Sequence, residues 1–161
     1  MLYHLDLIGH FLSAHSRHGT HSPFVYKLAS QVIYSNKFDR GEGEIVVDCT
    51  WNDPPRYLDL VKDILVHLGI YTLKDHGAGG GYWADFKKDR ETELISRIEN
   101  GQLLVVHEPH LDLPQWRALT KYDGVTVSID LFHFGLVLKR AGQRKENFSL
   151  RFPYWRCCQG R

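Results

Sequence analysis

The chain has 161 residues, of which 43% are apolar and 24% are charged. This composition is typical of a globular protein with one main core, and it excludes the disordered and fibrous classes. Twenty basic residues against nineteen acidic ones leave a net charge of +1. We therefore expect no nucleic-acid partner, because nucleic-acid binding requires a strongly basic surface.

The cysteines and the N-terminal sequence indicate a cytoplasmic protein. Cys49 stands alone and Cys157 is adjacent to Cys158, a spacing that gives no disulfide framework. No basic stretch precedes the apolar residues of the N-terminus, so we expect no secretory signal peptide. No apolar run approaches the roughly 20 residues that cross a bilayer, and we expect no membrane partner.

The N-terminal part of the chain predicts two helices. Apolar residues recur at helical spacing over residues 2–16. Ser22 and Pro23 start a second helix over residues 24–34, because the hydroxyl caps free N–H groups and the proline already holds a helical φ angle. We therefore expect an N-terminal helical segment over residues 1–40.

From residue 41 onward, apolar runs alternate between strand and helix patterns. The runs predict strands over 45–48, 70–73, 103–106, 125–131, 135–139 and 148–152, and helices over 53–68 and 83–100 and around 116–119. The unbroken run over 103–106 is typical of a parallel strand buried on both faces. The alternating run over 125–131 is typical of an antiparallel strand with one exposed face. The expected domain, residues 41–161, is α/β: a truncated Rossmann-like, mainly parallel sheet that ends in an antiparallel hairpin.

A glycine-rich loop over residues 75–81 is the sharpest local motif. Asp75, Gly77, Gly79 and Gly81 occupy alternate positions between a predicted strand and a predicted helix. Backbone N–H groups in such a loop approach a ligand closely, and the dipole of the following helix favours negative charge. The pattern predicts a cofactor-binding loop, and a strand-to-helix turn without a ligand is the alternative.

Histidine and carboxylate side chains follow the strand predicted over 103–106. His107, Glu108, His110 and Asp112 are ligand types that divalent metal ions accept. They also stand at the carboxyl end of a strand, where α/β proteins bind ligands. A metal site on His107, Glu108 and His110 is one prediction, and a solvated surface turn is the alternative.

A second histidine group precedes the second predicted helix. His15, His18 and His21 are spaced by three residues, which would place them on one face of a helix and suit Zn²⁺ or Ni²⁺. Gly19 interrupts that helix, so hydrogen-bonded turn histidines are the interpretation we favour.

Two separated segments of the chain carry a family resemblance. Residues 17–26 read RHGTHSPFVY, and residues 104–152 include VTVSIDLF, FGLVL and FSLRF. These segments resemble the two ends of a group of bacterial class I S-adenosylmethionine-dependent methyltransferase-like proteins. The resemblance implies a last parallel strand, a helix and a closing antiparallel hairpin. The D-x-G-x-G-x-G spacing over residues 75–81 is also the form of the first cofactor motif of class I methyltransferases.

The middle of the chain is shorter than in these proteins. Between Tyr34 and Leu103 there is room for fewer α/β units than the family has, so the chain resembles a shortened member. Three placements of the glycine loop follow. It is the cofactor loop, or it lies after the family's fourth strand, or it is a short D-x-G-A-G element that the family carries upstream of its cofactor domain.

The resemblance implies methyl transfer from S-adenosylmethionine to a small acceptor molecule. The loop over residues 75–81 would then hold the cofactor, Glu108 would bind its ribose or a divalent metal, and His110 would act as a base. One alternative is a non-catalytic relative that needs no cofactor and serves as an assembly or partner-binding module. Such a module would form a homo-oligomer through an open sheet edge or the N-terminal helices. The other alternative is a histidine-rich protein that binds divalent metals.

Overall fold

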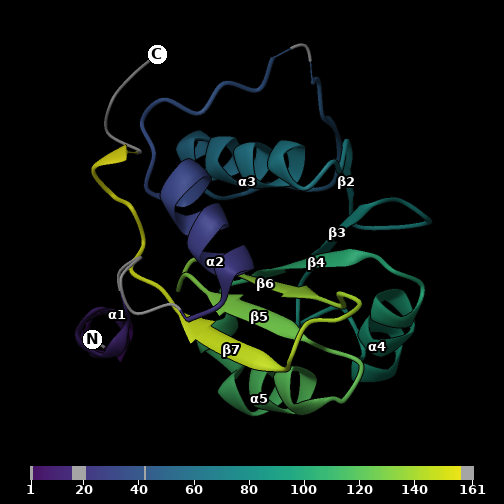
Figure 1. The fold of residues 1–161 in the computed structure, drawn as a ribbon. Coiled ribbons are helices and arrows are strands. Elements are labelled where there is room, and N and C mark those ends of the chain that lie inside the picture. Colours follow the sequence, from purple (N-terminus) through teal and green to yellow (C-terminus); the bar gives the residue numbers. More distant parts are fainter. Residues whose placement is uncertain (1, 16–20, 42, 157–161) are drawn as a thin grey trace.

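The structure is a computed structural model that describes residues 2–15, 21–41 and 43–156. His18 of the N-terminal histidine group and the pair Cys157–Cys158 lie outside these ranges. The described chain forms one seven-stranded mixed sheet with helices on both faces (Figure 1). The predicted α/β, Rossmann-like class is therefore confirmed.

The sheet has the strand order β1-β2-β3-β4-β6-β5-β7. Its strands are β1 (Val46–Asp48), β2 (Thr72–Lys74), β3 (Gly81–Ala84), β4 (Leu103–His107), β5 (Val127–Asp130), β6 (Phe134–Leu138) and β7 (Glu146–Ser149). Only β6 runs against the other strands: it lies between β4 and β5 and is antiparallel to both. The sheet is mainly parallel and contains one antiparallel hairpin, β5–β6, as the sequence predicts.

Helices cover both faces of this sheet. They are α1 (Leu2–Ser13), α2 (Pro23–Leu28), the π-helix η2 (Ala29–Ile33), α3 (Pro55–His67), α4 (Glu91–Glu99), the 3-10 turn η3 (Pro109–Asp112) and α5 (Leu113–Lys121). Helices α2, η2 and α3 pack on one face, and α4 and α5 pack on the other (Figure 1). Helix α2 begins as predicted, since Ser22 accepts the N–H of Val25 at 3.5 Å and Pro23 is the first helical residue.

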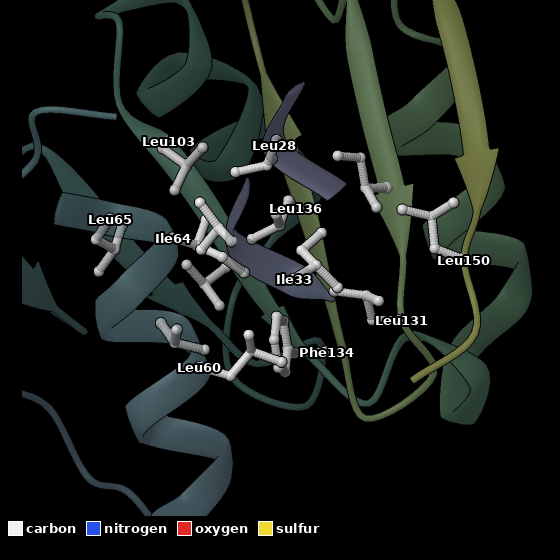
Figure 2. Packing of buried hydrophobic residues seen from close by; sticks show 14 of the residues in the cluster. Leu28, Ile33, Leu60, Ile64, Leu65, Leu103, Leu131, Phe134, Leu136 and Leu150 are labelled. Atoms are coloured by element: carbon white, nitrogen blue, oxygen red, sulfur yellow. The ribbon is translucent and has the colours of Figure 1, made fainter. Parts of the chain in front are cut away.

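Each face of the sheet has its own hydrophobic core. Leu103 and Val105 of β4 belong to the cluster that includes residues of α2, η2 and α3, whereas Leu104 and Val106 belong to the cluster that includes residues of α4 and α5. Figure 2 shows the first cluster, in which side chains from the helices meet Leu136 of β6. Burying one such side chain stabilises the fold by about 1.5–3 kcal/mol. The unbroken apolar run of β4 therefore results from burial on both faces.

The last strands differ in part from the expected pattern. Residues 125–131 pair antiparallel with β6 as expected, but the expected exposed face is wrong, since β5 is buried over its first three residues, and its other neighbour, β7, is parallel to it. The polar residue in its pattern, Ser128, is buried and donates a hydrogen bond to Asn147 Oδ1 at 2.6 Å. The predicted strand over 148–152 is also wrong in position and direction, since β7 ends at Ser149. A polar residue paired inside the sheet gives the same alternation as one that faces water.

The helix predicted from Trp83 to Asn100 is wrong in its first half. Residues 81–84 form β3, and α4 begins only at Glu91. Tyr82 packs into the core on one face of the sheet and Trp83 into the core on the other. Adjacent aromatic residues buried on opposite faces are typical of a central strand, so the strand pattern overrides the glycine-loop-to-helix expectation.

Helix α1 stands apart from both cores (Figure 1). Its outward residues Leu5, Ile8 and Leu12 are 55–74% exposed. In contrast, α2 and η2 of the predicted N-terminal segment are built into the larger core. Within the described ranges, no helix has the length and apolar content that a membrane span requires.

Candidate functional site

Acidic side chains gather where the parallel strands end. We call this line of carboxyl-terminal strand ends the carboxyl edge, as distinct from the sides of the sheet formed by the outer strands β1 and β7. These side chains, taken from β1 to β5, are Asp48, Asp75, Asp85, Glu108 and Asp130. In open α/β sheets, ligands bind outside the carboxyl ends of the strands. This edge is therefore the first place to examine for chemistry.

The centre of the carboxyl edge is an imidazole between two carboxylates. His107 Nε2 lies 3.0 Å from Asp53 Oδ2 and 3.7 Å from Glu108 Oε2. Asp53 comes from the loop between β1 and α3, and His107 is the last residue of β4. The hydrogen bond with Asp53 raises the pKa of His107, while burial acts in the opposite direction. The pair thus holds an oriented imidazole of increased basicity, as a general base requires.

Backbone strain coincides with this cluster. Glu108 has a left-handed conformation, with φ 39° and ψ 62°. Among the described residues, the only other non-glycine with positive φ is Phe132, at 70°, in the loop that follows β5. The Glu108 N–H bonds the carbonyl of His133 at 3.0 Å, so the loop after β4 is tied to the loop after β5. Residues held in such conformations cluster at functional sites, because the surrounding structure must compensate for their cost.

Two tryptophans form an aromatic wall beside His107. The rings of Trp51 and Trp83 lie 4.3 Å apart, and Trp83 lies 5.3 Å from the imidazole of His107. The indole N–H of Trp51 is buried and has no hydrogen-bond partner in the described part of the chain. A buried donor without an acceptor costs about 1–3 kcal/mol, so this N–H favours an acceptor from outside the protein.

His110 lies in a separate aromatic group. Its ring stacks on Phe132 at 3.9 Å, with 5° between the planes, and the edge of Tyr3 of α1 approaches it at 5.7 Å. Its Nδ1 bonds the carbonyl of Phe132 at 3.1 Å, and its Nε2 is buried without a partner among the described residues. The structure thus brings Glu108 to His107 and places His110 against Phe132.

His133 is the most buried of these histidines, at 6% exposed. Its ring stacks on Tyr57 at 4.6 Å, and its Nε2 lies 2.8 Å from the hydroxyl of Tyr154. Burial lowers the pKa of His133 to about 4. This imidazole is therefore neutral near pH 7 and joins the β5–β6 turn to α3 and the C-terminal segment.

His10 fastens α1 to the carboxyl edge. Its Nε2 lies 3.1 Å from Ser149 Oγ and 3.3 Å from Asp130 Oδ1. A serine nucleophile would need the hydroxyl and the carboxylate on different ring nitrogens, but here both share one. The contact is therefore structural: it holds α1 against the sheet, together with a parallel bridge between His15 and Leu150.

The described residues bring no three histidine, cysteine or acidic side chains together as metal ligands. His107 and Glu108 are close to each other, whereas His110 turns toward Phe132. The prediction of a metal on His107, Glu108 and His110 thus gains no support from the geometry.

The glycine loop packs against its own strand. It leaves the carboxyl edge after β2 and returns to the opposite edge, the amino edge, where β3 begins parallel to β2. The N–H of Gly80 bonds Thr72 Oγ1 at 2.9 Å, and a Cβ on Gly81 would lie 2.8 Å from the carbonyl of Thr72. A crossover between parallel strands usually takes a dozen or more residues, commonly a helix. Glycine permits the shorter path, because a side chain would collide with β2.

Of the four predicted cofactor residues, only Asp75 lies at the carboxyl edge. It accepts the N–H of Thr50 at 3.0 Å and pairs with His76 at 2.8 Å; these two contacts, His76 first, hold its pKa below the usual range. The carbonyls of Gly77 and Gly79 accept hydrogen bonds from side chains of α4 and of the turn before β4. Gly77 and Gly79 line a hollow of about 400 Å³ on the amino side. Cofactor binding by the three glycines stays a prediction, since close packing already explains them.

Sequence reasoning missed Asp53, Trp51 and His133 as members of the site. The sequence did carry a signal for Asp53 and Trp51. Both follow the first predicted strand, and the carboxyl ends of parallel strands lie at the same edge, so this loop must lie near the end of the strand that carries His107. No local signal marks His133, because its partners Tyr57 and Tyr154 are distant in sequence.

Comparison of the chain with protein-family models, with curated proteins and with solved structures gives no match. The geometry of the carboxyl edge is therefore the basis for assigning a function.

Proposed function

We propose that this domain binds a small molecule at the carboxyl edge and that His107 accepts a proton from it. The observation that carries this proposal is the position of His107 between the carboxylates of Asp53 and Glu108. The reaction we assign is the one that the sequence resemblance implies, methyl transfer to a hydroxyl or amine of a small acceptor.

Each residue of the cluster has a distinct part in this proposal. Asp53 orients the imidazole of His107 and increases its basicity through their hydrogen bond. His107 Nδ1 makes no hydrogen bond in the described residues, so it is the nitrogen that would take the proton. A positioned base of this kind contributes roughly 10²–10⁴-fold to a rate.

The side chains beside His107 suit an adenosyl cofactor with a positive charge. The half-buried ring of Trp51, backed by the buried Trp83, offers a surface for a purine, and the unpaired N–H of Trp51 offers a donor. The carboxylate of Glu108 would accept hydrogen bonds from ribose hydroxyls. S-adenosylmethionine supplies an electrophilic methyl group when it is bound. In this proposal these residues hold it, and the glycines on the amino side do not.

Titration with S-adenosylhomocysteine, followed by tryptophan fluorescence and calorimetry, tests the assignment. We expect binding in the micromolar range that Glu108→Gln and Trp51→Phe each weaken about tenfold, as loss of one buried polar or stacking contact does. His21→Gln is the matched control, because His21 is exposed and remote from the acidic cluster in sequence. No signal at millimolar ligand in a folded sample would exclude methyl transfer.

A second function, assembly, is favoured by the exposed face of α1. Leu5, Ile8 and Leu12 form an apolar stripe on a 12-residue helix, and a helix of this length is marginal in water without packing. The occupant we propose is a second copy of the chain, since two such stripes pair by two-fold symmetry. Strand β1 adds an open sheet edge, where Val46 is 58% exposed.

Light scattering across a concentration series tests assembly separately from ligand binding. We expect a dimer mass that Ile8→Glu and Leu12→Glu convert to a monomer, because each places a charge in the apolar contact. Lys62→Glu, on α3, is the charge-change control. A monomer at every concentration of the unchanged protein would contradict this second function and leave the first unaffected.

A further inference from the structure

A second concave surface lies at the amino edge, on the opposite side of the molecule from His107. It is a hollow of about 560 Å³ between α2, the end of α3 and the chain that follows β6. Its lining residues are Pro23, Phe24, Lys27, His67, Leu68, Arg140 and Gln143. We call it the basic hollow, because three of these residues are basic and none is acidic.

Two cationic side chains share the basic hollow. Lys27 and Arg140 both line it and make no ion pair within the described part of the chain, a property they share with lysines elsewhere, such as Lys62 and Lys87. A cleft lined by charge of one sign raises the local concentration of the opposite ion. The hollow therefore attracts anions.

Arg140 is held in place by its surroundings. Its guanidinium lies 3.9 Å from the centre of the Phe24 ring, and its backbone N–H bonds Thr126 Oγ1 at 2.7 Å. A guanidinium is planar, and its fork of N–H donors suits two oxygens of a phosphate; stacking on Phe24 fixes the orientation of that plane. Preorganisation of this kind reduces the entropy lost on binding.

The remaining polar groups of the hollow complete an anion site. Burial, and then the charge of Lys27, lower the pKa of His67, so its neutral imidazole offers an N–H donor near pH 7. The carboxylate of Glu146 accepts a hydrogen bond from the amide of Gln143 at 2.8 Å. The same amide reaches Ser22 Oγ at 3.2 Å, so Gln143 separates that charge from the hollow.

We propose that the basic hollow binds a small phosphorylated molecule, with its phosphate between Lys27 and Arg140 and its apolar part against Leu68 and Pro23. The apolar lining distinguishes such a ligand from free phosphate, which has nothing to place there. The two edges would then bind ligands of opposite charge. This site is independent of the function proposed for the carboxyl edge.

Phenyl phosphate and inorganic phosphate are the probes that test this site, followed by amide shifts in NMR. We expect shifts confined to residues 23–28, 67–69 and 140–143, with phenyl phosphate binding several-fold more tightly than inorganic phosphate because its ring covers apolar surface. Lys27→Gln and Arg140→Gln should each raise the dissociation constant about tenfold, as loss of a charge-assisted hydrogen bond does.

Two controls keep the result interpretable. Arg140→Lys retains the charge but loses the stacked, planar guanidinium, so it should bind more weakly than the unchanged protein and more tightly than Arg140→Gln. Lys87→Gln removes an exposed lysine of the β3–α4 loop and should have no effect. Lys27→Gln leaves the Arg140–Phe24 contact intact, so it can test the site by itself if the Arg140→Gln variant does not fold. The proposal is overturned if roughly 10 mM phenyl phosphate gives no shifts in these segments. It is also overturned if Lys27→Gln and Lys87→Gln bind equally well.

Discussion

The two edges of the sheet differ in charge, strain and packing. The carboxyl edge collects carboxylates, both strained non-glycine residues and the unpaired indole N–H of Trp51. The amino edge collects the basic hollow and the tightly packed end of the glycine loop. Most of the strained and unpaired groups among the described residues thus lie at the carboxyl edge. The unpaired Nε of Arg97 lies at the amino edge beside Gly77, where the conspicuous glycines are explained by packing. A motif that stands out in sequence is therefore a weaker guide to chemistry than strain and unpaired polar groups in the structure.

Helix α3 connects the two edges and contributes to their difference. Asp53 lies just before its first turn, and His67 is its last residue. An acidic group near the start of a helix complements the helix dipole by about 0.3–1 kcal/mol, whereas His67, whose pKa is lowered by burial, is neutral near pH 7 and adds no charge at the other end. The pattern stabilises the helix, but it does not explain why Lys27 and Arg140 make no ion pair with any carboxylate that the structure describes.

The largest effect is expected at Gly81, where the glycine loop meets β3. A Cβ there would lie 2.8 Å from the backbone carbonyl of Thr72 and 3.3 Å from a methyl group of Leu65, both in packed elements. We expect Gly81→Val to lower the free energy of unfolding by roughly 3 kcal/mol or more, because backbone cannot move aside cheaply. Urea denaturation measures this change.

Gly77 provides the matched comparison. It has a φ of 64°, and a Cβ there would meet no atom within 4 Å. Asparagine tolerates that conformation, so Gly77→Asn should cost less than about 1 kcal/mol. Equal losses at Gly77 and Gly81 would contradict the packing explanation of the loop.

Acid sensitivity should follow from His133 at the carboxyl edge. The folded pKa, about 4, lies below the ordinary value of 6.5, so the unfolded chain binds more protons between these values. The contribution of His133 to the free energy of unfolding should therefore have its full value above about pH 6.5. It should fall by on the order of 2–3 kcal/mol as the pH drops toward 4. When denaturant midpoints are plotted against pH over this range, the slope should be shallower for His133→Phe than for the unchanged protein. The same slope in both proteins would refute the assignment.

A smaller effect is expected when Asp53 is neutralised. The hydrogen bond that His107 donates to Asp53 is the main cause of the raised pKa of His107, and burial opposes it. Asp53→Asn should lower that pKa, and the loss of the charged partner should cost about 1 kcal/mol of stability at pH 6. A raised folded pKa gives stability that is present below about 6.5 and is lost as the pH rises through the folded value.

Imidazole NMR titration measures the pKa of His107 directly. Asp123→Asn, at an exposed position after α5, is the control for loss of one negative charge. If both substitutions lower the pKa of His107 equally, the raised pKa results from the general electrostatic field of the protein and not from the specific contact with Asp53.

The sequence predicts the architecture well because burial leaves a strong pattern. The apolar run of β4, the amphipathic face of α3 and the Ser22–Pro23 start of α2 all lie where expected. Strand β3 was missed because the glycine loop suggested a following helix, although Tyr82 and Trp83 carried the strand signal. Local periodicity cannot show that two consecutive strands, here β2 and β3, are parallel neighbours joined by a loop without a helix between them.

The candidate site was predicted only in part. His107 and Glu108 were recognised by their place after a buried strand, and the structure brings them within 3.7 Å of each other. His110 follows the same strand, but the stacking on Phe132 that turns it away depends on a loop more than 20 residues later. Side-chain direction at a strand end is set by distant partners, which spacing alone does not reveal.

The bridge between His15 and Leu150 has a consequence for folding. The N–H of His15 bonds the carbonyl of Ser149 at 2.8 Å, so the segment after α1 is ordered by an element that comes much later in the chain. Contacts between such distant residues form late and raise the contact order, which slows folding. During synthesis, the contacts of His10 and His15 with the β7 region therefore form only after β7 has emerged, so α1 stays undocked until then.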